Sequence, residues 1–266
     1  MTRRLRLDAE LVRRGLARSR DQAAELIAAG RVEVAGAPAG KAATQVGLDA
    51  AIIVREPPQG TDYVSRGGHK LAGALAALGG PPVAGRRCLD AGASTGGFTE
   101  VLLAAGAEHV VAVDVGYGQL AWPLRTDPRV TVLDRVNVRS LQPEQVAPAP
   151  SLVTADLSFI SLTLVLPALV ACAVPGADLV LMVKPQFEVG KGKVGSGGVV
   201  RDPALRQAAV TVVAAAAAVA GLGVAGVTAS PLPGPSGNVE YFLWLRAGAP
   251  PLEDEALRRA VAAGPQ

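Results

Sequence analysis

Apolar positions recur with two different periods along the chain, and the change in period divides it into two parts. In the first part, helix-like periodicity covers 7–15 and 19–30, each ending at a glycine, and a capping box occupies 19–22. Alternating apolar residues then predict short strands at 31–34 and 51–54. This first part is therefore expected to form a small α+β unit.

From residue 85 onward, strand-like apolar segments alternate with helix-like segments, which is typical of a mostly parallel sheet. The last two strands are too close together for a crossover helix, so we expect them to pair antiparallel. The predicted strands are 87–90, 110–114, 130–133, 152–156, 179–183, 224–229 and 241–246. The second part is therefore an α/β sheet.

One uncharged stretch, 208–229, is long enough to cross a membrane by length alone. Most of it is Ala and Gly, which contribute little to membrane insertion. It also breaks at 221–223 into a helix-like half and a Val-rich half. A buried helix followed by a strand is therefore the favoured interpretation, and no membrane partner is expected.

Composition narrows the class of protein. Of 266 residues, 50% are hydrophobic and 18% are charged, which excludes a disordered chain. Two cysteines and two histidines supply neither a disulfide framework nor a His-based metal site. The first residues do not lead into the apolar core of a signal peptide. We therefore expect a cytoplasmic protein without a bound metal. A monomer is the expected oligomeric state.

Charge is distributed unevenly. Residues 1–87 hold 14 Arg or Lys and 8 Asp or Glu, whereas the rest of the chain holds 12 and 15. The excess of positive charge in the N-terminal part indicates a segment that binds a polyanion. Arginines that only solvate the exposed faces of helices would give the same count. Because Arg supplies most of the positive charge, each lysine is a candidate for chemistry that Arg cannot perform. The lysines are Lys41, Lys70, Lys184, Lys191 and Lys193.

This N-terminal part resembles the S4 RNA-binding domain. The matching residues are Arg6-Leu7-Asp8, Gly15-Leu16, Ser19-Arg20, Ala24, Leu26-Ile27, Gly30, Val32, Val34 and Lys41. The resemblance implies contacts with RNA phosphates, which give affinity and register but little base specificity. The implied contacts are Arg4, Arg6, Arg18, Arg20 and Lys41.

A glycine-rich turn, 90–98, leads from the first strand of the sheet into a helix, where glycines let a ligand approach free backbone amides. Its spacing fits neither a P-loop nor the dinucleotide fingerprint, and a tight structural turn would also explain the glycines. Asp114 ends the next strand, where a carboxylate can accept both hydroxyls of a ribose. Together these features resemble the S-adenosyl-L-methionine pocket of Rossmann-like methyltransferases. The implied cofactor contacts are Asp90, Gly92, Ala93, Ser94, Thr95, Gly96, Gly97, Phe98, Asp114, Asp156 and Phe159.

Further charged residues lie where strands end or begin. Asp156 and Lys184 close two strands, and Glu240 opens the last one. Ligands bind at the carboxyl ends of parallel strands, so these residues are candidates for catalysis, with a structural salt bridge as the alternative. Lys70 precedes the first strand, either in a loop folded over the same edge or as a solvated residue beside a helix at 71–78.

Lys70, Asp156, Lys184 and Glu240 resemble the Lys-Asp-Lys-Glu tetrad of the FtsJ-type ribose 2′-O-methyltransferases. Over residues 3–246 the chain resembles the TlyA family of ribosomal RNA methyltransferases, also known as haemolysin A. The matching runs are 65–71, 114–120, 185–191 and 230–241. The resemblance implies 2′-O-methylation of cytidine in ribosomal RNA of the small and also the large subunit. It also implies an S4 domain at 3–60, a linker at 61–66, a methyltransferase domain at 67–248 and a tail at 249–266.

A ribose hydroxyl is a poor nucleophile, so a base must remove its proton as the methyl group arrives. Lys184 is the expected base because an amine, unlike a guanidinium, can be neutral at that moment. Lys70 is expected to supply a neighbouring cation, and Asp156 to orient Lys184 and steer the methylsulfonium group. Glu240 is expected to position either Lys70 or the ribose.

Two nearby features stay open between interpretations. The glycine-rich segment 190–198, with Lys191 and Lys193, is either a flap that orders over RNA or cofactor, or a surface connection. Phe159 packs against the cofactor, stacks on an extruded nucleotide or belongs to the core. Arg66 is a further expected RNA contact.

Two other functions fit parts of the sequence. A non-catalytic S4 RNA-binding protein is disfavoured by the intact glycine turn and the complete tetrad. A pore former, suggested by the haemolysin name, needs a membrane-active segment rich in large apolar residues, and the sequence shows none.

Overall fold

The computed structural model describes residues 4–17, 20–28, 30–55 and 63–265. They form two compact units that divide between residues 62 and 63, called here the N-terminal unit and the C-terminal unit. Arg18, the expected capping residue Ser19 and residues 61–62 of the expected linker lie outside the described residues.

The N-terminal unit joins two helices to short strands. Its elements are β1 (Arg4–Arg6), α1 (Leu7–Arg13), α2 (Arg20–Ala28), β2 (Val32–Val34), β3 (Ala37–Pro38), β4 (Gln45–Gly47) and β5 (Ile52–Val54). β2 lies between β3 and β5, and β1 pairs separately with β4. Leu7 and Leu11 of α1 pack with Ile27 of α2 in the core. The α+β prediction is confirmed, although β1, β3 and β4 are too short to show a period.

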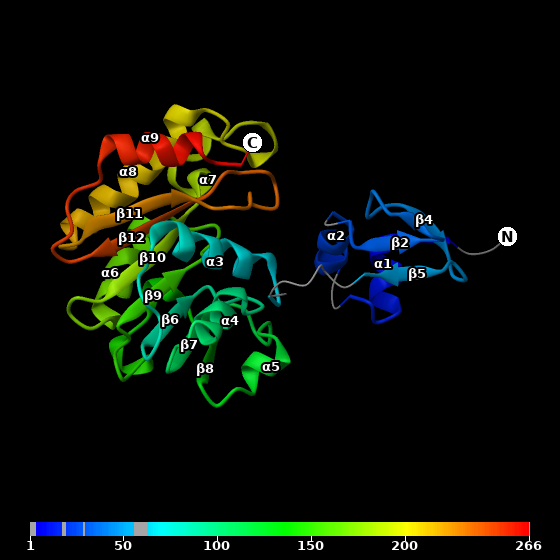
Figure 1. The fold of residues 1–266 in the computed structure, drawn as a ribbon, viewed down its shortest axis with the longest axis horizontal. Helices are drawn as coiled ribbons and strands as arrows, with labels where there is room; N and C mark the ends of the chain where they lie inside the picture. Colours follow the sequence, from blue (N-terminus) through cyan, green and yellow to red (C-terminus); the bar gives the residue numbers. More distant parts are fainter. Residues whose placement is uncertain (1–3, 18–19, 29, 56–62, 266) are drawn as a thin grey trace. The chain divides into compact units, whose positions relative to one another are not determined.

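The C-terminal unit is built on a seven-stranded sheet (Figure 1). Its strands are β6 (Arg87–Ala91), β7 (His109–Asp114), β8 (Val130–Asp134), β9 (Leu152–Ala155), β10 (Asp178–Val183), β11 (Gly223–Ala229) and β12 (Tyr241–Arg246). They lie in the order β11-β12-β10-β9-β6-β7-β8, and β12 pairs antiparallel with both of its neighbours, β10 and β11, whereas the other pairs are parallel. The predicted Rossmann-like sheet is thereby confirmed, including its antiparallel end.

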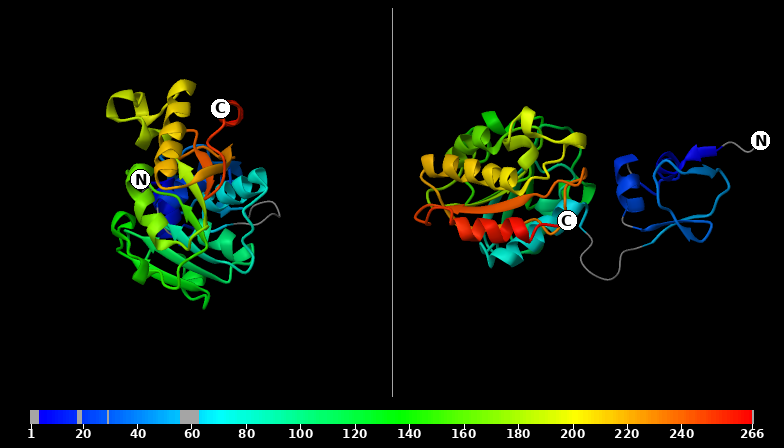
Figure 2. Two further views of the ribbon diagram at one scale, coloured as in Figure 1. Left: turned by 90° about the vertical axis from the view of Figure 1, so that its left-hand side faces the viewer. Right: turned by 90° about the horizontal axis from the view of Figure 1, so that it is seen from above.

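Helices cover both faces of this sheet. The larger ones are α3 (Arg66–Leu78), α4 (Gly97–Ala104), α6 (Leu162–Cys172), α8 (Pro203–Val219) and α9 (Asp254–Ala262). Alternate strand residues serve opposite cores: Val111 packs with α6 and α8, and Val110 packs with α3 and α4. Figure 2 shows α8 in yellow and α3 in cyan on opposite sides of the strands.

Apart from these larger helices, the segments between the strands of the C-terminal unit contain short helical turns. These are α5 (Trp122–Arg125), α7 (Pro185–Glu188) and 3-10 turns at Val138–Ser140, Pro143–Gln145, Lys191–Lys193 and Ser196–Gly198. The uncharged stretch 208–229 forms most of α8 and then β11, as expected. Within the described residues, no helix is long and apolar enough to cross a membrane.

Two segments outside the expected methyltransferase range belong to the C-terminal unit. Tyr63 packs against the start of α3, and α9 packs against β11. Helix α3 begins at Arg66, five residues before the expected start. Gly67 and Gly68 are poor helix formers, which hides this first turn in the sequence. A Cβ at Gly68 would lie 2.3 Å from the Tyr63 side chain, so close packing requires glycine there.

Candidate active site

Charged residues gather at the edge where the parallel strands end. Asp156 and Lys184 directly follow β9 and β10. Strand β12 runs the other way and begins at this edge, where Val183 and Tyr241 are register partners. Lys184 and Glu240 are the next residues beyond that pair, so the topology places them opposite one another.

The first of two ion pairs at this edge joins Lys184 to Asp156. Nζ of Lys184 lies 2.6 Å from Oδ1 of Asp156 and donates a 2.9 Å hydrogen bond to Oγ of Ser158. Lys184 is buried. Two oxygen partners in a largely dry site therefore hold the amine in one position.

The second ion pair joins Lys70 to Glu240. Nζ of Lys70 donates to Oε2 of Glu240 at 2.6 Å, and both side chains are buried. Lys70 lies within α3, so the loop and the solvated position considered for it are both wrong. Removing one partner of such a pair leaves an unpaired buried charge, at a cost of roughly 3–5 kcal/mol.

The glycine-rich turn is tied to neighbouring strand ends. Gly92 has a φ of +87°, and a Cβ there would lie 2.4 Å from the carbonyl oxygen of Asp156, so only glycine fits. The backbone N–H of Ser94 donates to Oδ2 of Asp114 at 2.8 Å. The N–H of Gly116 donates to Oδ1 at 2.7 Å. These bonds fix the plane of a carboxylate that is still half-exposed. Ala93, Thr95, Gly96 and Gly97 complete the turn.

Asp90 is a fully buried carboxylate beneath this turn. Its Oδ2 accepts a 2.6 Å hydrogen bond from Oγ1 of Thr99, whereas Oδ1 has no partner among the described residues. Burial raises the pKa of Asp90 to about 7, and the charges of Asp156 and Asp114 add to the rise. A buried acceptor without a partner is uncommon in a folded core and is typical of sites that bind a ligand.

The two phenylalanines expected near the cofactor lie in opposite environments. Phe98 is buried with its ring 6.0 Å from that of Phe242, so its side chain packs in the core. Phe159 is 91% exposed, and its ring lies 5.3 Å from that of Phe187. The core position considered for Phe159 is therefore wrong. Its φ of +64° is uncommon for a bulky residue, so the surrounding loop must impose it.

Glu188 is a site residue that the sequence did not single out. Its carboxylate accepts hydrogen bonds from Oγ of Ser161 at 2.5 Å and from the N–H of Leu162 at 2.8 Å. It thereby ties the loop that carries Phe159 to α7, just beyond Lys184. Burial raises the pKa of Glu188. Its only sequence signal is its position in the run 185–191, because its partners lie on another loop.

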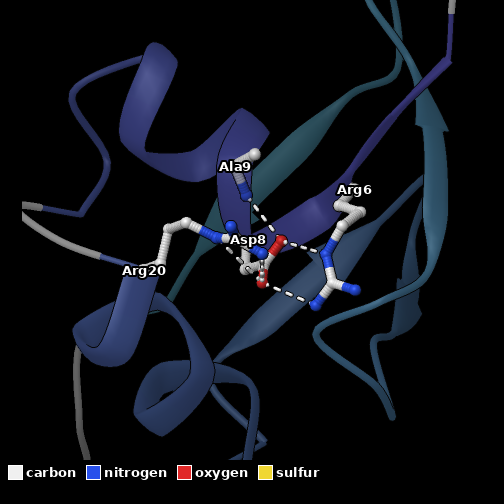
Figure 3. A network of polar contacts seen from close by, with 4 residues as sticks. All are labelled: Arg6, Asp8, Ala9 and Arg20. Atoms are coloured by element: carbon white, nitrogen blue, oxygen red, sulfur yellow. Dashed lines mark hydrogen bonds and ion pairs between the residues drawn. The ribbon is translucent and has the colours of Figure 1, made fainter.

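In the N-terminal unit, the expected RNA contacts fall into two groups. Arg4 and Lys41 are exposed. Arg6 and Arg20 both form ion pairs with Asp8, which lies between them (Figure 3). The expected RNA contacts of this unit that the structure describes are therefore two exposed basic side chains, Arg4 and Lys41, and two arginines that share the carboxylate of Asp8.

In the C-terminal unit, Nη2 of Arg66 donates to the carbonyl oxygen of Pro233 at 3.1 Å. Lys193 is exposed on the segment 190–198, whereas the side chain of Lys191 lies outside the described residues. Nowhere in the described ranges do three His, Cys, Asp or Glu side chains gather into a metal-binding group.

Family models match both units. Residues 63–247 match the FtsJ-like methyltransferase model, and residues 5–52 match the S4 domain model. The fold and the strand-end site thus define a member of the FtsJ-like methyltransferases that carries an S4 domain.

Comparison with individual proteins shows to which family within the FtsJ-like methyltransferases the chain belongs. The chain is 63% identical, over 100% of both chains, to the 16S/23S rRNA (cytidine-2′-O)-methyltransferase TlyA of Mycobacterium tuberculosis. It is 37% identical to Hemolysin A of Brachyspira hyodysenteriae, over 90% of this chain and 98% of that one. A solved structure from Streptococcus thermophilus with a provisional hemolysin name has 36% identity and a TM-score of 0.78, covering 98% of this chain and 96% of that chain. The chain belongs to the TlyA family.

Proposed function

We propose that this protein transfers a methyl group from S-adenosyl-L-methionine to the ribose 2′-oxygen of cytidine in ribosomal RNA of both subunits. The observation that carries the proposal is that two Lys–carboxylate pairs, with both lysines buried, lie with a glycine-rich turn at one sheet edge. A protein that only binds RNA has no need for such a site. The name of the M. tuberculosis relative supports the same reaction.

The residues around the turn fit S-adenosyl-L-methionine. The oriented carboxylate of Asp114 keeps acceptor capacity for the two ribose hydroxyls of the cofactor. Asp90, whose Oδ1 has no partner among the described residues, and Asp156 are acidic side chains at this edge that suit a sulfonium and an ammonium group. When bound, the cofactor supplies an electrophilic methyl group on positively charged sulfur.

The reaction needs a group that takes the proton of the 2′-hydroxyl as the oxygen forms its bond to carbon. Nζ of Lys184 takes this proton, and Asp156 and Ser158 hold the amine toward the ribose. Lys70, fixed by Glu240, adds a cation that favours a developing negative charge on the oxygen. Alignment of the reacting atoms supplies the rest of the acceleration.

Asp114→Ala should weaken binding of S-adenosyl-L-methionine by about 10- to 100-fold, because hydrogen bonds to a charged acceptor are worth roughly 1.5–3 kcal/mol. Isothermal titration calorimetry measures this directly. Asp127→Ala is the matched control, since Asp127 pairs with Arg129 before β8, at the opposite edge of the sheet. Equal affinity of Asp114→Ala and the parent protein would refute the assignment.

Phe159→Ala should reduce methylation of RNA by about 5- to 100-fold, because a base stacked on an aromatic ring contributes roughly 1–3 kcal/mol. Its ring is 91% exposed, so the melting temperature and cofactor affinity should not change. Phe159→Trp, which keeps a stacking surface, should retain most activity. If cofactor affinity falls and RNA saturation does not change, the ring serves the cofactor and not the nucleotide.

The proposed function is tested with small and large ribosomal subunits that lack the modification. Incubation with methyl-labelled S-adenosyl-L-methionine should transfer label to the rRNA. The same assay with Lys184→Ala is the control for a contaminating enzyme. Absence of label from both subunits, in a preparation that binds the cofactor, would contradict the proposal.

A further inference from the structure

A carboxylate lies between two arginines in the N-terminal unit (Figure 3). Oδ1 and Oδ2 of Asp8 accept hydrogen bonds from Nε and Nη2 of Arg6 at 3.0 and 2.9 Å. Oδ2 also accepts from Nη2 and Nε of Arg20 at 3.0 and 3.3 Å. The N–H of Ala9 donates to Oδ1 at 2.8 Å. A single carboxylate thus joins β1, α1 and α2.

The two guanidinium groups keep an open side. Each donates from Nε and Nη2, one edge of its plane, to Asp8, so that the opposite edge with Nη1 points away from the carboxylate. The side chains of Arg6 and Arg20 are 45% and 59% exposed, whereas Asp8 is buried. The cluster therefore presents donors and a net positive charge to the solvent.

Asp8 is ionised wherever the protein is folded at ordinary pH. The hydrogen bonds from Arg6 hold the pKa of Asp8 well below its usual value, and the contacts with Arg20 and Ala9 add to this effect. A negative charge beside an RNA-binding surface repels phosphates. Its presence there needs a reason other than contact with RNA.

A second cluster on the same helix gives the comparison. Glu10 is buried and accepts hydrogen bonds from Arg13 and Arg14. Nη1 and Nη2 of Arg14 are used by the carbonyl oxygens of Ala50 and Leu48, and the Arg14 side chain is only 23% exposed. Arg14 is therefore a structural brace. Arg13 donates from Nε and Nη2 to Glu10 and is 52% exposed, so the Glu10 cluster presents one exposed arginine where the Asp8 cluster presents two.

We propose that Asp8 is a positioning residue that holds Arg6 and Arg20 as a preformed clamp for neighbouring phosphates of the RNA backbone. The inference rests on the proposed function, which supplies RNA as the ligand. Free arginine side chains lose rotamer freedom when they bind, and a guanidinium already fixed to a carboxylate loses less. Asp8 raises RNA affinity in this way despite its charge.

The test is Asp8→Asn in the full chain, with affinity for subunit rRNA measured by filter binding at several salt concentrations. Coulomb's law alone predicts tighter binding, because a negative charge is lost. Positioning predicts binding weaker by roughly tenfold, from the renewed freedom of two arginines. Glu10→Gln is the matched control; it removes the same charge from α1 but frees only one exposed arginine, Arg13, so it should weaken binding less than Asp8→Asn does. Circular dichroism melting confirms that each variant is folded.

A double-mutant cycle separates positioning from a general structural effect. In an Arg6→Ala/Arg20→Ala background, Asp8→Asn should cause no further loss of affinity, because the arginines through which it acts are absent. If Asp8→Asn does not fold, Arg20→Lys is the alternative test. Lysine keeps the positive charge but cannot donate from two nitrogens to Asp8, so RNA binding should weaken.

Unchanged or tighter binding by folded Asp8→Asn overturns the inference, as does an equal loss in the double-alanine background or full affinity of Arg20→Lys. Failure of the parent protein to bind or methylate rRNA would instead overturn the proposed function, so the two failures are distinguishable.

Discussion

Lys184→Ala should lower the rate of methyl transfer at saturating substrates by about 100- to 10,000-fold, which is the range for loss of a general base. Affinity for S-adenosyl-L-methionine should change little, because the amine contacts Asp156 and Ser158 and not the glycine-rich turn. Single-turnover transfer to subunit rRNA isolates this step from product release.

Lys184→Arg distinguishes a base from a fixed cation. The guanidinium keeps the positive charge beside Asp156 but does not release its proton at working pH. The Arg variant should therefore be as inactive as the Ala variant. Substantial activity of Lys184→Arg would assign the residue an electrostatic role and leave the base elsewhere.

Asp90→Asn should gain stability relative to the parent protein by about 3 kcal/mol as pH rises from 5 to 8. The pKa of Asp90 is about 7 in the folded protein, above the value of roughly 3.9 for an unfolded chain. Ionisation therefore opposes folding, and the parent loses stability between these two values. Asparagine does not ionise, so this loss disappears.

Urea denaturation of both proteins at pH 5 and pH 8, followed by tryptophan fluorescence, measures the difference. The two tryptophans, Trp122 and Trp244, both lie in the C-terminal unit and report on the unit that holds Asp90. The same variant should bind S-adenosyl-L-methionine more weakly, since a charge that is costly to bury is kept for a ligand. A stability difference independent of pH would show that Asp90 is not the titrating group.

The strands of the C-terminal unit can be predicted from the sequence because each is a mostly apolar run between turns. The same logic placed Asp156 and Lys184 at one edge, since both follow such runs. The first turn of α3 cannot be predicted from the sequence. Its glycines weaken any helical signal, yet they allow the close packing that carries Lys70 into the interior.

Partners within the site were harder to predict than positions. The family resemblance left open whether Glu240 holds Lys70 or the ribose, and the structure gives Lys70, 170 residues away in sequence. Glu188 and Asp8 act through contacts between loops and helices that no periodic pattern marks. Such contacts depend on the tertiary fold, so the sequence alone does not reveal them.

The central claim is that the methyl group is delivered to a ribose oxygen above the two Lys–carboxylate pairs. After reaction with methyl-labelled cofactor, subunit rRNA is digested to nucleosides and analysed by mass spectrometry. All label should appear in 2′-O-methylcytidine, whose fragmentation leaves the methyl group on the sugar. Label on the cytosine base, or on another nucleoside, would contradict the account.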